Sequence, residues 1–283
     1  MSNKIYIGVD IGGTTIVSGL MVNGVVTNSH SVETCSDKSK ELVLNQLYKS
    51  IDEVITDDIQ AIGIGCPGFI NSKEGVIVNI NNIPALQGVN LVKEVFEKYK
   101  KPVYIDNDAN CFVLGEAYFG AGQGYEHVLG ITLGTGLGGG IVIEKKAYGG
   151  LCGAAGEIGC IPFKDGTIED YTSSKFFANK YNSNGYDLFV KAESGDPVAI
   201  SSFRELGNNI GWLINNMLYT VAPEAIIIGG SIVGAYKYIE PGILDKLNEF
   251  LFDIIKKNIV IKPAVLSNAG VVGAASLCVS NIK

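Results

Sequence analysis

The sequence predicts an α/β fold built from two similar lobes. Short apolar strand patterns alternate along the chain with stretches in which apolar residues recur at helical spacing, as is typical of α/β proteins. A second observation is a repeat. The opening pattern of a strand, a polar glycine turn and another strand returns between Val128 and Ile143. We therefore expect an internal duplication in which each lobe contributes one glycine-rich hairpin.

The break between the lobes is expected at the glycine-rich segment from Gly120 to Gly124. The smaller N-terminal lobe would then comprise residues 1–119 together with about 268–283, and the larger lobe residues 120–267. A chain of 283 residues could form either one large domain or two lobes, so its length does not decide the number of domains.

Apolar periodicity predicts the elements of each half. In the first half we expect strands at 5–9, 25–32, 59–66, 76–80 and 102–105, and a further strand that begins near residue 16. We expect helices at 44–54, 91–99 and 108–117. In the second half we expect strands at 128–133, 140–143, 225–228 and 264–266, and helices at 203–221, 243–254 and 271–279. Trp212 lies on an apolar helix stripe, so we expect it in the core and not against a ligand.

The charge and the histidine content give little support to several classes of site. The net charge of −7 gives no support for nucleic-acid binding, which usually needs a basic face. Any phosphate must then be bound by backbone amides and a metal ion. The two histidines, His30 and His127, stand in unrelated contexts and give little support for a catalytic triad or a histidine-rich zinc site.

The sequence predicts a cytoplasmic protein. No apolar run approaches the roughly 18 residues of a membrane-spanning helix, and the first residues lead directly into a strand, without the pattern of a signal peptide. The six cysteines are scattered and form no Cys-x-x-Cys pair, so we interpret them as reduced thiols.

The opening strand ends in a short turn whose residues suit a phosphate group. Gly12 and Gly13 let the backbone approach a ligand closely, and bare N–H groups with the Thr14 and Thr15 hydroxyls could bind phosphate oxygens. Asp10 could hold hydrated Mg²⁺ through water, since that ion takes few protein ligands. These residues alone are equally compatible with an ordinary glycine hairpin and a solvated aspartate.

A second glycine turn, Gly134-Thr135-Gly136, begins a match to the dinucleotide fingerprint Gly-x-Gly-x-x-Gly. That fingerprint requires a helix directly after the glycines, whereas residues 140–143 are β-like. The chain also lacks the Gly-x-x-x-x-Gly-Lys-Ser/Thr motif. We therefore interpret this turn as a second phosphate hairpin, and two such hairpins imply a polyphosphate ligand.

Several motifs together resemble the ROK family (repressor, open reading frame, kinase) of the ASKHA superfamily. They occur in the family's order over nearly the whole chain: Asp10-x-Gly-Gly-Thr-Thr, Gly65-Cys66-Pro67-Gly68, residues 106–110 (Asp-Asn-Asp-Ala-Asn), Gly134-Thr135-Gly136, residues 153–159 (Gly-Ala-Ala-Gly-Glu-Ile-Gly) and Gly229-Gly230. The resemblance implies a two-lobed actin-like ATPase (ribonuclease H-like) fold, with a duplicated βββαβαβα lobe and a ligand cleft between the lobes. It also implies that Gly229 and Gly230 contact the adenosine of ATP.

Asp108 matches the position of the family's catalytic base. A strand end that opens a helix would place Asn107 and Asp108 near unpaired helix amides. A sugar hydroxyl that attacks ATP needs a proton acceptor, and a carboxylate can serve. The alternative is that one of the two residues only caps the helix, and both roles can hold together.

The resemblance also assigns sugar-binding residues. Asn107 and Glu157 are implied to bind sugar hydroxyls, work for which amides and carboxylates are suited. Glu169 resembles the second sugar-binding glutamate, although it could equally be an acid favoured at a helix N-terminus. Gly68 and Asn82 are expected to line the same pocket.

The chain departs from the family pattern where relatives bind structural zinc. Cys160 replaces the usual histidine after the Glu157 motif, and the cysteine cluster that follows in relatives is absent. Structural zinc usually needs four cysteine or histidine ligands. We therefore expect no structural zinc, and expect Ile161, Pro162 and Phe163 to brace the loop by burying apolar surface.

The leading hypothesis is a glucokinase-like hexose kinase that uses ATP and Mg²⁺. Fructose, mannose, an N-acetylhexosamine or a β-glucoside remain alternatives to glucose. Two other classes are a sugar-responsive transcriptional regulator and a sugar-binding protein without catalysis. Family regulators carry a helix-turn-helix domain before the first hairpin, where this sequence has nine residues before Asp10. The resemblance further implies a homodimer whose ligands are a sugar and ATP.

Overall fold

The computed structural model describes residues 4–282. These residues divide into two compact units, the first formed by 4–126, 140–156 and 265–282 and the second by 127–139 and 157–264. The expected lobes differ from these units at residues 120–126, 140–156 and 265–267, all of which belong to the first unit, and 140–156 is the longest of these segments. In the structure this segment contacts earlier elements, since β10 (Lys146–Ala147) contacts α3 (Asp108–Phe119) and η2 (Leu151–Gly153) contacts β5 (Phe69–Asn71). None of the described helices is long and apolar enough to cross a membrane.

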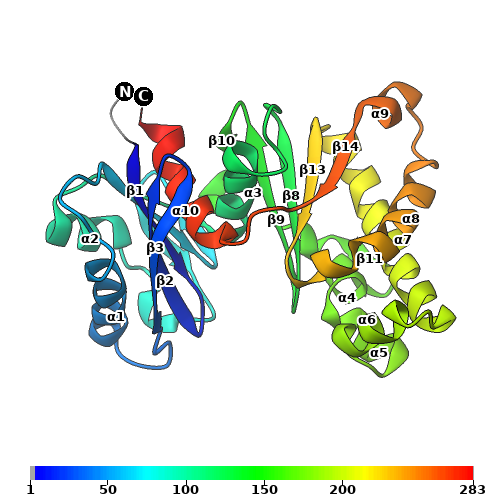
Figure 1. The fold of residues 1–283 in the computed structure, drawn as a ribbon, viewed down its shortest axis with the longest axis horizontal. Helices are drawn as coiled ribbons and strands as arrows, with labels where there is room; N and C mark the ends of the chain where they lie inside the picture. Colours follow the sequence, from blue (N-terminus) through cyan, green and yellow to red (C-terminus); the bar gives the residue numbers. More distant parts are fainter. Residues whose placement is uncertain (1–3, 283) are drawn as a thin grey trace. The chain divides into compact units, whose positions relative to one another are not determined.

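Two five-stranded sheets of the same topology form the framework (Figure 1). The first has the order β3-β2-β1-β4-β7, with β1 Ile5–Ile11, β2 Thr15–Val22, β3 Val25–Glu33, β4 Ala61–Cys66 and β7 Val103–Asn107. The second has the order β10-β9-β8-β13-β14, with β8 Val128–Leu133, β9 Leu137–Ile143, β13 Ala225–Gly229 and β14 Val260–Pro263. In each sheet two strands joined by a short glycine turn precede two later strands that add in parallel. The expected duplication is confirmed.

The helices and smaller elements fill the connections between these strands. Those of the first unit are α1 Lys40–Asp52, β6 Val76–Asn79, η1 Pro84–Leu86, α2 Leu91–Tyr99 and α10 Ala269–Asn281. Those of the second unit are η3 Ile158–Cys160, β11 Pro162–Phe163, β12 Gly166–Thr167, α4 Ile168–Thr172, α5 Ser174–Tyr181, α6 Gly185–Glu193, α7 Pro197–Thr220, η4 Ser231–Ala235, α8 Tyr236–Leu247 and α9 Asp253–Asn258.

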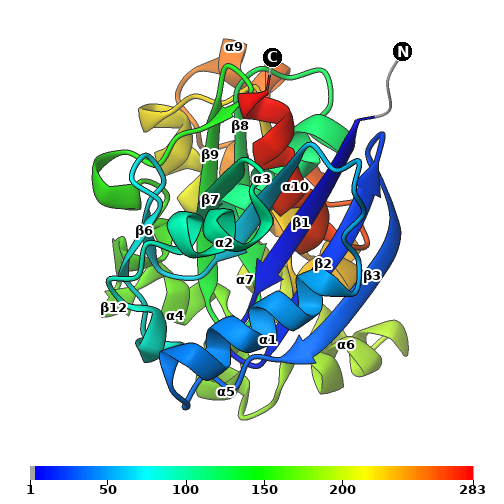
Figure 2. The same ribbon diagram turned by 90° about the vertical axis from the view of Figure 1, so that its left-hand side faces the viewer.

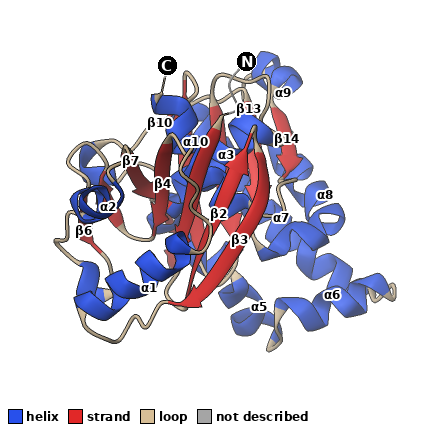
Figure 3. Ribbon diagram, turned by 60° about the vertical axis from the view of Figure 1, so that its left-hand side comes forward, coloured by secondary structure: helices blue, strands red, loops and turns tan. Residues whose placement is uncertain are grey.

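Alternation along β1 gives the first sheet two buried faces. Ile7 and Val9 belong to a core that also contains Leu47 of α1, whereas Tyr6 belongs to a core with Ala275 of α10. Figure 2 shows α1 on one side of this sheet and α10 on the other, and Figure 3 shows α1 beside β2 and β3, which it contacts. Because successive side chains of a strand point to opposite faces, a helix covers each side.

Two expected elements of the second half were wrong. The apolar series expected as one helix over 243–254 is divided, because α8 ends at Leu247 and Phe250 lies in the following turn, where its ring stacks on Tyr219 at 4.4 Å. The strand expected at 264–266 lies earlier, at Val260–Pro263. Pro263 is tolerated in that strand because β14 is an edge strand of its sheet. A proline has no N–H to donate, and on an edge strand the missing donor can fall on the side that has no neighbouring strand.

Helix α10 packs directly on the backbone of the first sheet. A Cβ at Gly8 of β1 would lie 1.9 Å from the Val271 carbonyl oxygen, and one at Gly63 of β4 would lie 1.9 Å from that of Ala274. On the helix itself, a Cβ at Gly273 would lie 2.2 Å from the Cys111 carbonyl oxygen of α3. Glycine at these positions is therefore a condition for the close approach of α10 to β1, β4 and α3.

Gly63→Ala should reduce the free energy of unfolding by about 3 kcal/mol or more, because a buried methyl group has no space there and the helix must move. Urea unfolding measures the change. The matched control is Gly234→Ala, where an added Cβ meets nothing within 4 Å. Equal midpoints for both variants would contradict the close packing of α10.

Candidate functional site

The first glycine turn is held by backbone hydrogen bonds and by one buried threonine. The Gly12 N–H donates to the Thr15 carbonyl at 2.8 Å. Thr34, which follows β3, donates its N–H to the Thr14 carbonyl at 2.9 Å and its hydroxyl to the Gly12 carbonyl at 2.7 Å. Thr14 and Thr15 remain exposed. Sequence reasoning missed Thr34, because its partners lie about twenty residues earlier in the chain.

Asp10 stands near the end of β1 in an environment that disfavours a charge. Burial raises the pKa of its carboxyl to about 6, and the carboxylate of Asp108 contributes in the same direction. A Cβ at Gly270, in the first turn of α10, would lie 2.0 Å from Asp10 Oδ2, so that glycine leaves the carboxylate its space. A hydrated divalent cation fits this donor set, since positive charge would offset both the burial and the repulsion from Asp108.

Three parallel strands bring the predicted residues of the first unit to one edge of its sheet. Asp10 pairs with Gly65 of β4, and Gly65 pairs with Asp106 of β7. The residues that follow these strands therefore leave the sheet at its carboxyl edge, where open α/β sheets bind ligands. Asn82 lies there too, because its Cβ would be 3.4 Å from a Cβ added at Gly13.

Asn107 has two structural partners. Its Oδ1 accepts from the Ala109 N–H at 2.8 Å, so Asn107 is the N-cap of α3, and its Nδ2 donates to the Gly68 carbonyl at 2.9 Å. Gly68 has a φ of +95°, and a Cβ there would lie 2.2 Å from the Asn79 carbonyl oxygen, so this turn requires glycine. The capping role considered for Asn107 is confirmed, and it fixes the start of α3.

Asp108 is the first residue of α3, and its side chain remains exposed. The protein around it nevertheless raises the pKa of its carboxyl by desolvation, while a 2.9 Å hydrogen bond from the Ala109 N–H to Oδ1 acts in the opposite direction. An accessible carboxylate of raised pKa, fixed at a helix start, can accept a proton from a bound hydroxyl.

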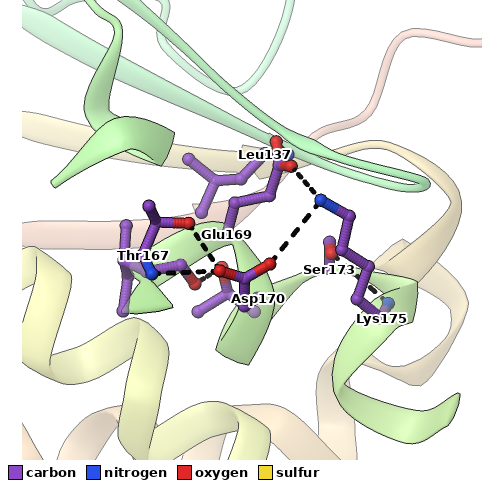
Figure 4. A network of polar contacts seen from close by, with 8 residues as sticks. Leu137, Thr167, Glu169, Asp170, Ser173 and Lys175 are labelled. Atoms are coloured by element: carbon purple, nitrogen blue, oxygen red, sulfur yellow. Dashed lines mark hydrogen bonds and ion pairs between the residues drawn. The ribbon is translucent and has the colours of Figure 1, made fainter. Parts of the chain in front are cut away.

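In the second unit, elements far along the chain hold the turn Gly134-Thr135-Gly136. The Gly134 carbonyl accepts from the Ser174 N–H at 2.9 Å. On the other side of the turn, the Leu137 N–H donates to Glu169 Oε2 at 3.1 Å. Figure 4 shows Glu169 between Leu137 and Lys175, whose Nζ lies 2.7 Å from Oε1. Thr135, at the tip of the turn, is exposed.

Glu169 thus makes contacts that neither interpretation of its sequence foresaw. It does lie in the first turn of α4, as the helix-acid interpretation expected, but both carboxylate oxygens have protein partners. Glu157 lies exposed directly before η3. The structure brings their segments together, because a Cβ at Gly159 would lie 3.7 Å from the Cβ of Glu169. The sugar-binding role of both glutamates stays a prediction.

Gly229 and Gly230 lie at the end of β13, beside β8. Gly229 pairs with Thr132, and Gly230 has a φ of +89°. A Cβ at Gly230 would lie 2.2 Å from the Leu133 carbonyl oxygen, so glycine permits the chain to pass next to the second turn.

A cavity of about 380 Å³ opens beside this second turn, and sequence reasoning missed it. Its lining is mainly apolar and comes from β8, α4, α5, α6, α7 and η4, including Gly134, Phe177, Tyr186, Phe189, Phe203 and Ile232. These residues are scattered over about a hundred positions, so no local motif marked them. A flat apolar ring of the size of a nucleobase fits such a lining.

The hairpin of β11 and β12 is braced by aromatic packing. The Phe163 ring lies 4.5 Å from the ring of half-buried Trp212 and 5.2 Å from that of Tyr171, and the Lys164 ammonium lies over Phe163 and Tyr171. Within residues 4–282, no group of three or more His, Cys, Asp and Glu side chains could hold a metal ion. Of the three residues expected to brace this loop, Phe163 does so through its ring contacts, whereas Pro162 is exposed.

Comparisons with known proteins agree with this architecture. A model of the ROK family matches residues 6–281. The chain is 31% identical over 316 residues to the glucokinase of Halalkalibacterium halodurans, covering 98% of this chain and 96% of that protein. It is 30% identical over 309 residues to the N-acetyl-D-glucosamine kinase of Histophilus somni, covering 97% and 99%.

Among solved structures, a ROK family glucokinase from Streptomyces griseus in complex with glucose and AMPPNP matches with a TM-score of 0.79. The two chains are 31% identical, and the match covers 96% of this chain and 98% of the other. The expected actin-like ATPase fold is thereby confirmed. The chain belongs to the ROK family.

Proposed function

We propose that this protein is an ATP-dependent hexose kinase. The observation that carries the proposal is the carboxyl edge of the first sheet, where an accessible carboxylate of raised pKa, Asp108, shares the sheet with the glycine turn of Asp10. Phosphoryl transfer from ATP to a hydroxyl needs a proton acceptor and a phosphate site, and these groups supply both. Whole-length relatives named as sugar kinases support the assignment.

The phosphates of ATP are assigned to the two glycine turns. Gly12, Gly13, Thr14 and Thr15 offer N–H groups and hydroxyls in the first unit, and residues 134–136 offer theirs in the second. The apolar cavity beside Gly134 takes the adenine ring, with Gly229 and Gly230 against the adenosine. Asp10 holds Mg²⁺ through water, and the ion when bound neutralises charge on the phosphates.

The sugar hydroxyls are assigned to five residues besides Asp108. Asn107, Gly68 and Asn82 belong to the first unit, and Glu157 and Glu169 to the second. Asp108 accepts the proton of the attacking hydroxyl, which makes the oxygen a better nucleophile as its bond to phosphorus forms. The carboxylate is fixed by the start of α3, so little reorganisation accompanies the transfer.

The finer features of this assignment are glucose as substrate, a homodimer, a cytoplasmic location and the absence of structural zinc. Kinases for glucose and for N-acetyl-D-glucosamine both occur among relatives of about 30% identity. Glucose is the first choice, and the other sugars considered from the sequence remain open. The packing of Phe163 on Trp212 and Tyr171 supports a loop that folds without zinc.

A coupled assay of ADP release over a panel of hexoses tests the function. With Mg²⁺ and ATP present, we expect one sugar, with glucose first, to stimulate ADP release at least about a hundredfold over the rate without sugar. The panel includes fructose, mannose, N-acetylglucosamine, N-acetylmannosamine and a β-glucoside. If calorimetry detects sugar binding but no sugar stimulates release, the chain is a binding protein or a regulator and the proposal is wrong.

Asp108→Asn should reduce kcat at least about a hundredfold and leave sugar affinity nearly unchanged, because the substitution removes the proton acceptor and keeps the shape. Steady-state kinetics and calorimetry with the active sugar measure the two effects. Asp57→Asn, at an exposed surface position, is the control and should retain wild-type activity. A near-wild-type kcat in Asp108→Asn would remove this residue from the mechanism.

Asp10→Asn should stabilise the metal-free protein at pH 7.5 by up to about 3 kcal/mol. The folded pKa of about 6 lies above the ordinary value of 3.8, so the folded state binds the proton more tightly than the unfolded state. The loss of folding stability caused by the Asp10 charge is therefore absent below pH 3.8, grows as the pH rises to about 6, and reaches its full size above that pH.

Urea unfolding at pH 4 and pH 7.5, without Mg²⁺ or nucleotide, measures this difference. The gain from Asp10→Asn should appear at pH 7.5 and be small at pH 4, while Asp57→Asn should show neither effect. A variant that is less stable than wild type at pH 7.5 would show that Asp10 contributes to folding.

A further inference from the structure

Residues of α4 and α5 hold both ends of the second glycine turn. On one side, the Ser174 N–H binds the Gly134 carbonyl directly. On the other side, Glu169 Oε2 accepts from the Leu137 N–H, and its Oε1 pairs with the Lys175 ammonium 2.7 Å away. We call Glu169, Ser174 and Lys175 the turn clamp. Figure 4 shows the Lys175 ammonium beside the Glu169 carboxylate, which in turn lies beside Leu137.

The position of Lys175 is itself fixed by a second carboxylate. Its Nζ lies 3.6 Å from Asp170 Oδ1. The other oxygen of Asp170 accepts from the N–H and the hydroxyl of Thr167, which caps α4, at 3.0 and 2.9 Å. Two neighbouring carboxylates therefore share one ammonium. Without the Lys175 ammonium, the carboxylates of Glu169 and Asp170 would repel each other. This repulsion would favour a movement of the Glu169 carboxylate away from the Leu137 amide.

The clamp determines the shape of a turn that must fit a phosphate. Gly136 lies so close to Glu169 that an added Cβ would be 2.8 Å from Oε2, so a movement of the carboxylate changes the space around the turn. The hydrogen bond from the Leu137 amide is to an ionised acceptor, which makes it stronger than a bond between neutral groups. Sub-ångström placement of backbone N–H groups matters in a site built mainly from them.

We propose that Lys175 is a positioning residue for the nucleotide, which keeps Glu169 on the Leu137 amide and thereby holds the turn Gly134-Thr135-Gly136 in the shape that binds phosphate. This role rests on the proposed function, since it assumes that ATP phosphates bind at this turn. Lys175 does not touch the phosphates. Its effect on the turn is transmitted by the Glu169 carboxylate.

Calorimetry without sugar tests the role, with Mg·AMPPNP and adenosine as separate probes. Lys175→Met should weaken AMPPNP binding about tenfold and leave adenosine binding unchanged, because adenosine has no phosphate. Lys175→Arg, which keeps the positive charge, should retain most of the wild-type AMPPNP affinity. The matched control is Lys180→Met on the same helix, which breaks the ion pair with Glu205 at a comparably exposed position and should change neither affinity.

Glu169→Ala separates positioning from direct contact. If Lys175 acts through Glu169, this variant loses as much AMPPNP affinity as Lys175→Met, and the double variant loses no more. Tighter AMPPNP binding by Glu169→Ala would mean that the freed ammonium contacts phosphate, and would overturn the proposal. An equal loss for adenosine, or wild-type AMPPNP affinity in Lys175→Met, would also overturn it. A wild-type chain that binds no AMPPNP would instead refute the nucleotide site itself.

Discussion

The direct packing of α10 on the glycine backbone of the first sheet is the constraint on which the rest of that unit depends. Gly8 and Gly63 let the helix approach β1 and β4, and Gly273 lets it approach α3. One helix from the end of the chain thus contacts β1, which carries Asp10, and α3, which carries Asp108. Any outward movement of α10 would separate these elements, because packed interiors yield little without loss of contacts.

The same packing keeps two carboxylates in surroundings where their ionised forms cost free energy of folding. Burial raises the pKa of both carboxyls, Asp10 and Asp108. The two are close enough that the charge of Asp108 raises the pKa of Asp10 further. Cys66 and Cys111, with thiol pKa values that burial raises, stay uncharged nearby. Perturbed groups of this kind concentrate at functional sites, where charge is useful only once a ligand or cation balances it.

The two glycine turns look alike in the sequence, but they are supported differently. Thr34 braces the first with one hydroxyl and one amide, both directed at backbone carbonyls. An ion-paired glutamate and a helix amide hold the second. An exposed ion pair contributes little to stability. The pair of Glu169 and Lys175 is therefore better understood as a means of fixing a backbone amide than as a source of folding energy.

Local pattern determined most of the fold. Alternation and helical periodicity predicted the two hairpins, the duplication and the long helix, because these depend on neighbouring residues. The motifs around Asp10, Asn107, Asp108 and residues 134–136 were also visible, since each is a short run whose residue types match its chemistry. The expected helix over 243–254 and strand over 264–266 failed where tertiary contacts overrode the local pattern: Phe250 stacks on Tyr219, and the edge position of β14 accommodates Pro263.

Only the tertiary structure decided which distant residues complete these motifs. Thr34 reaches the first turn from the end of another strand, Glu169 reaches the second from a helix over thirty residues later, and residues from six elements line the apolar cavity. The sequence by itself determined most of the strands, the two glycine turns and the chemistry that their residues offer. It could not determine whether the carboxylate of Glu169 faces solvent or a backbone amide, because that depends on the packing of α4 and α5 against the turn, which no local spacing encodes.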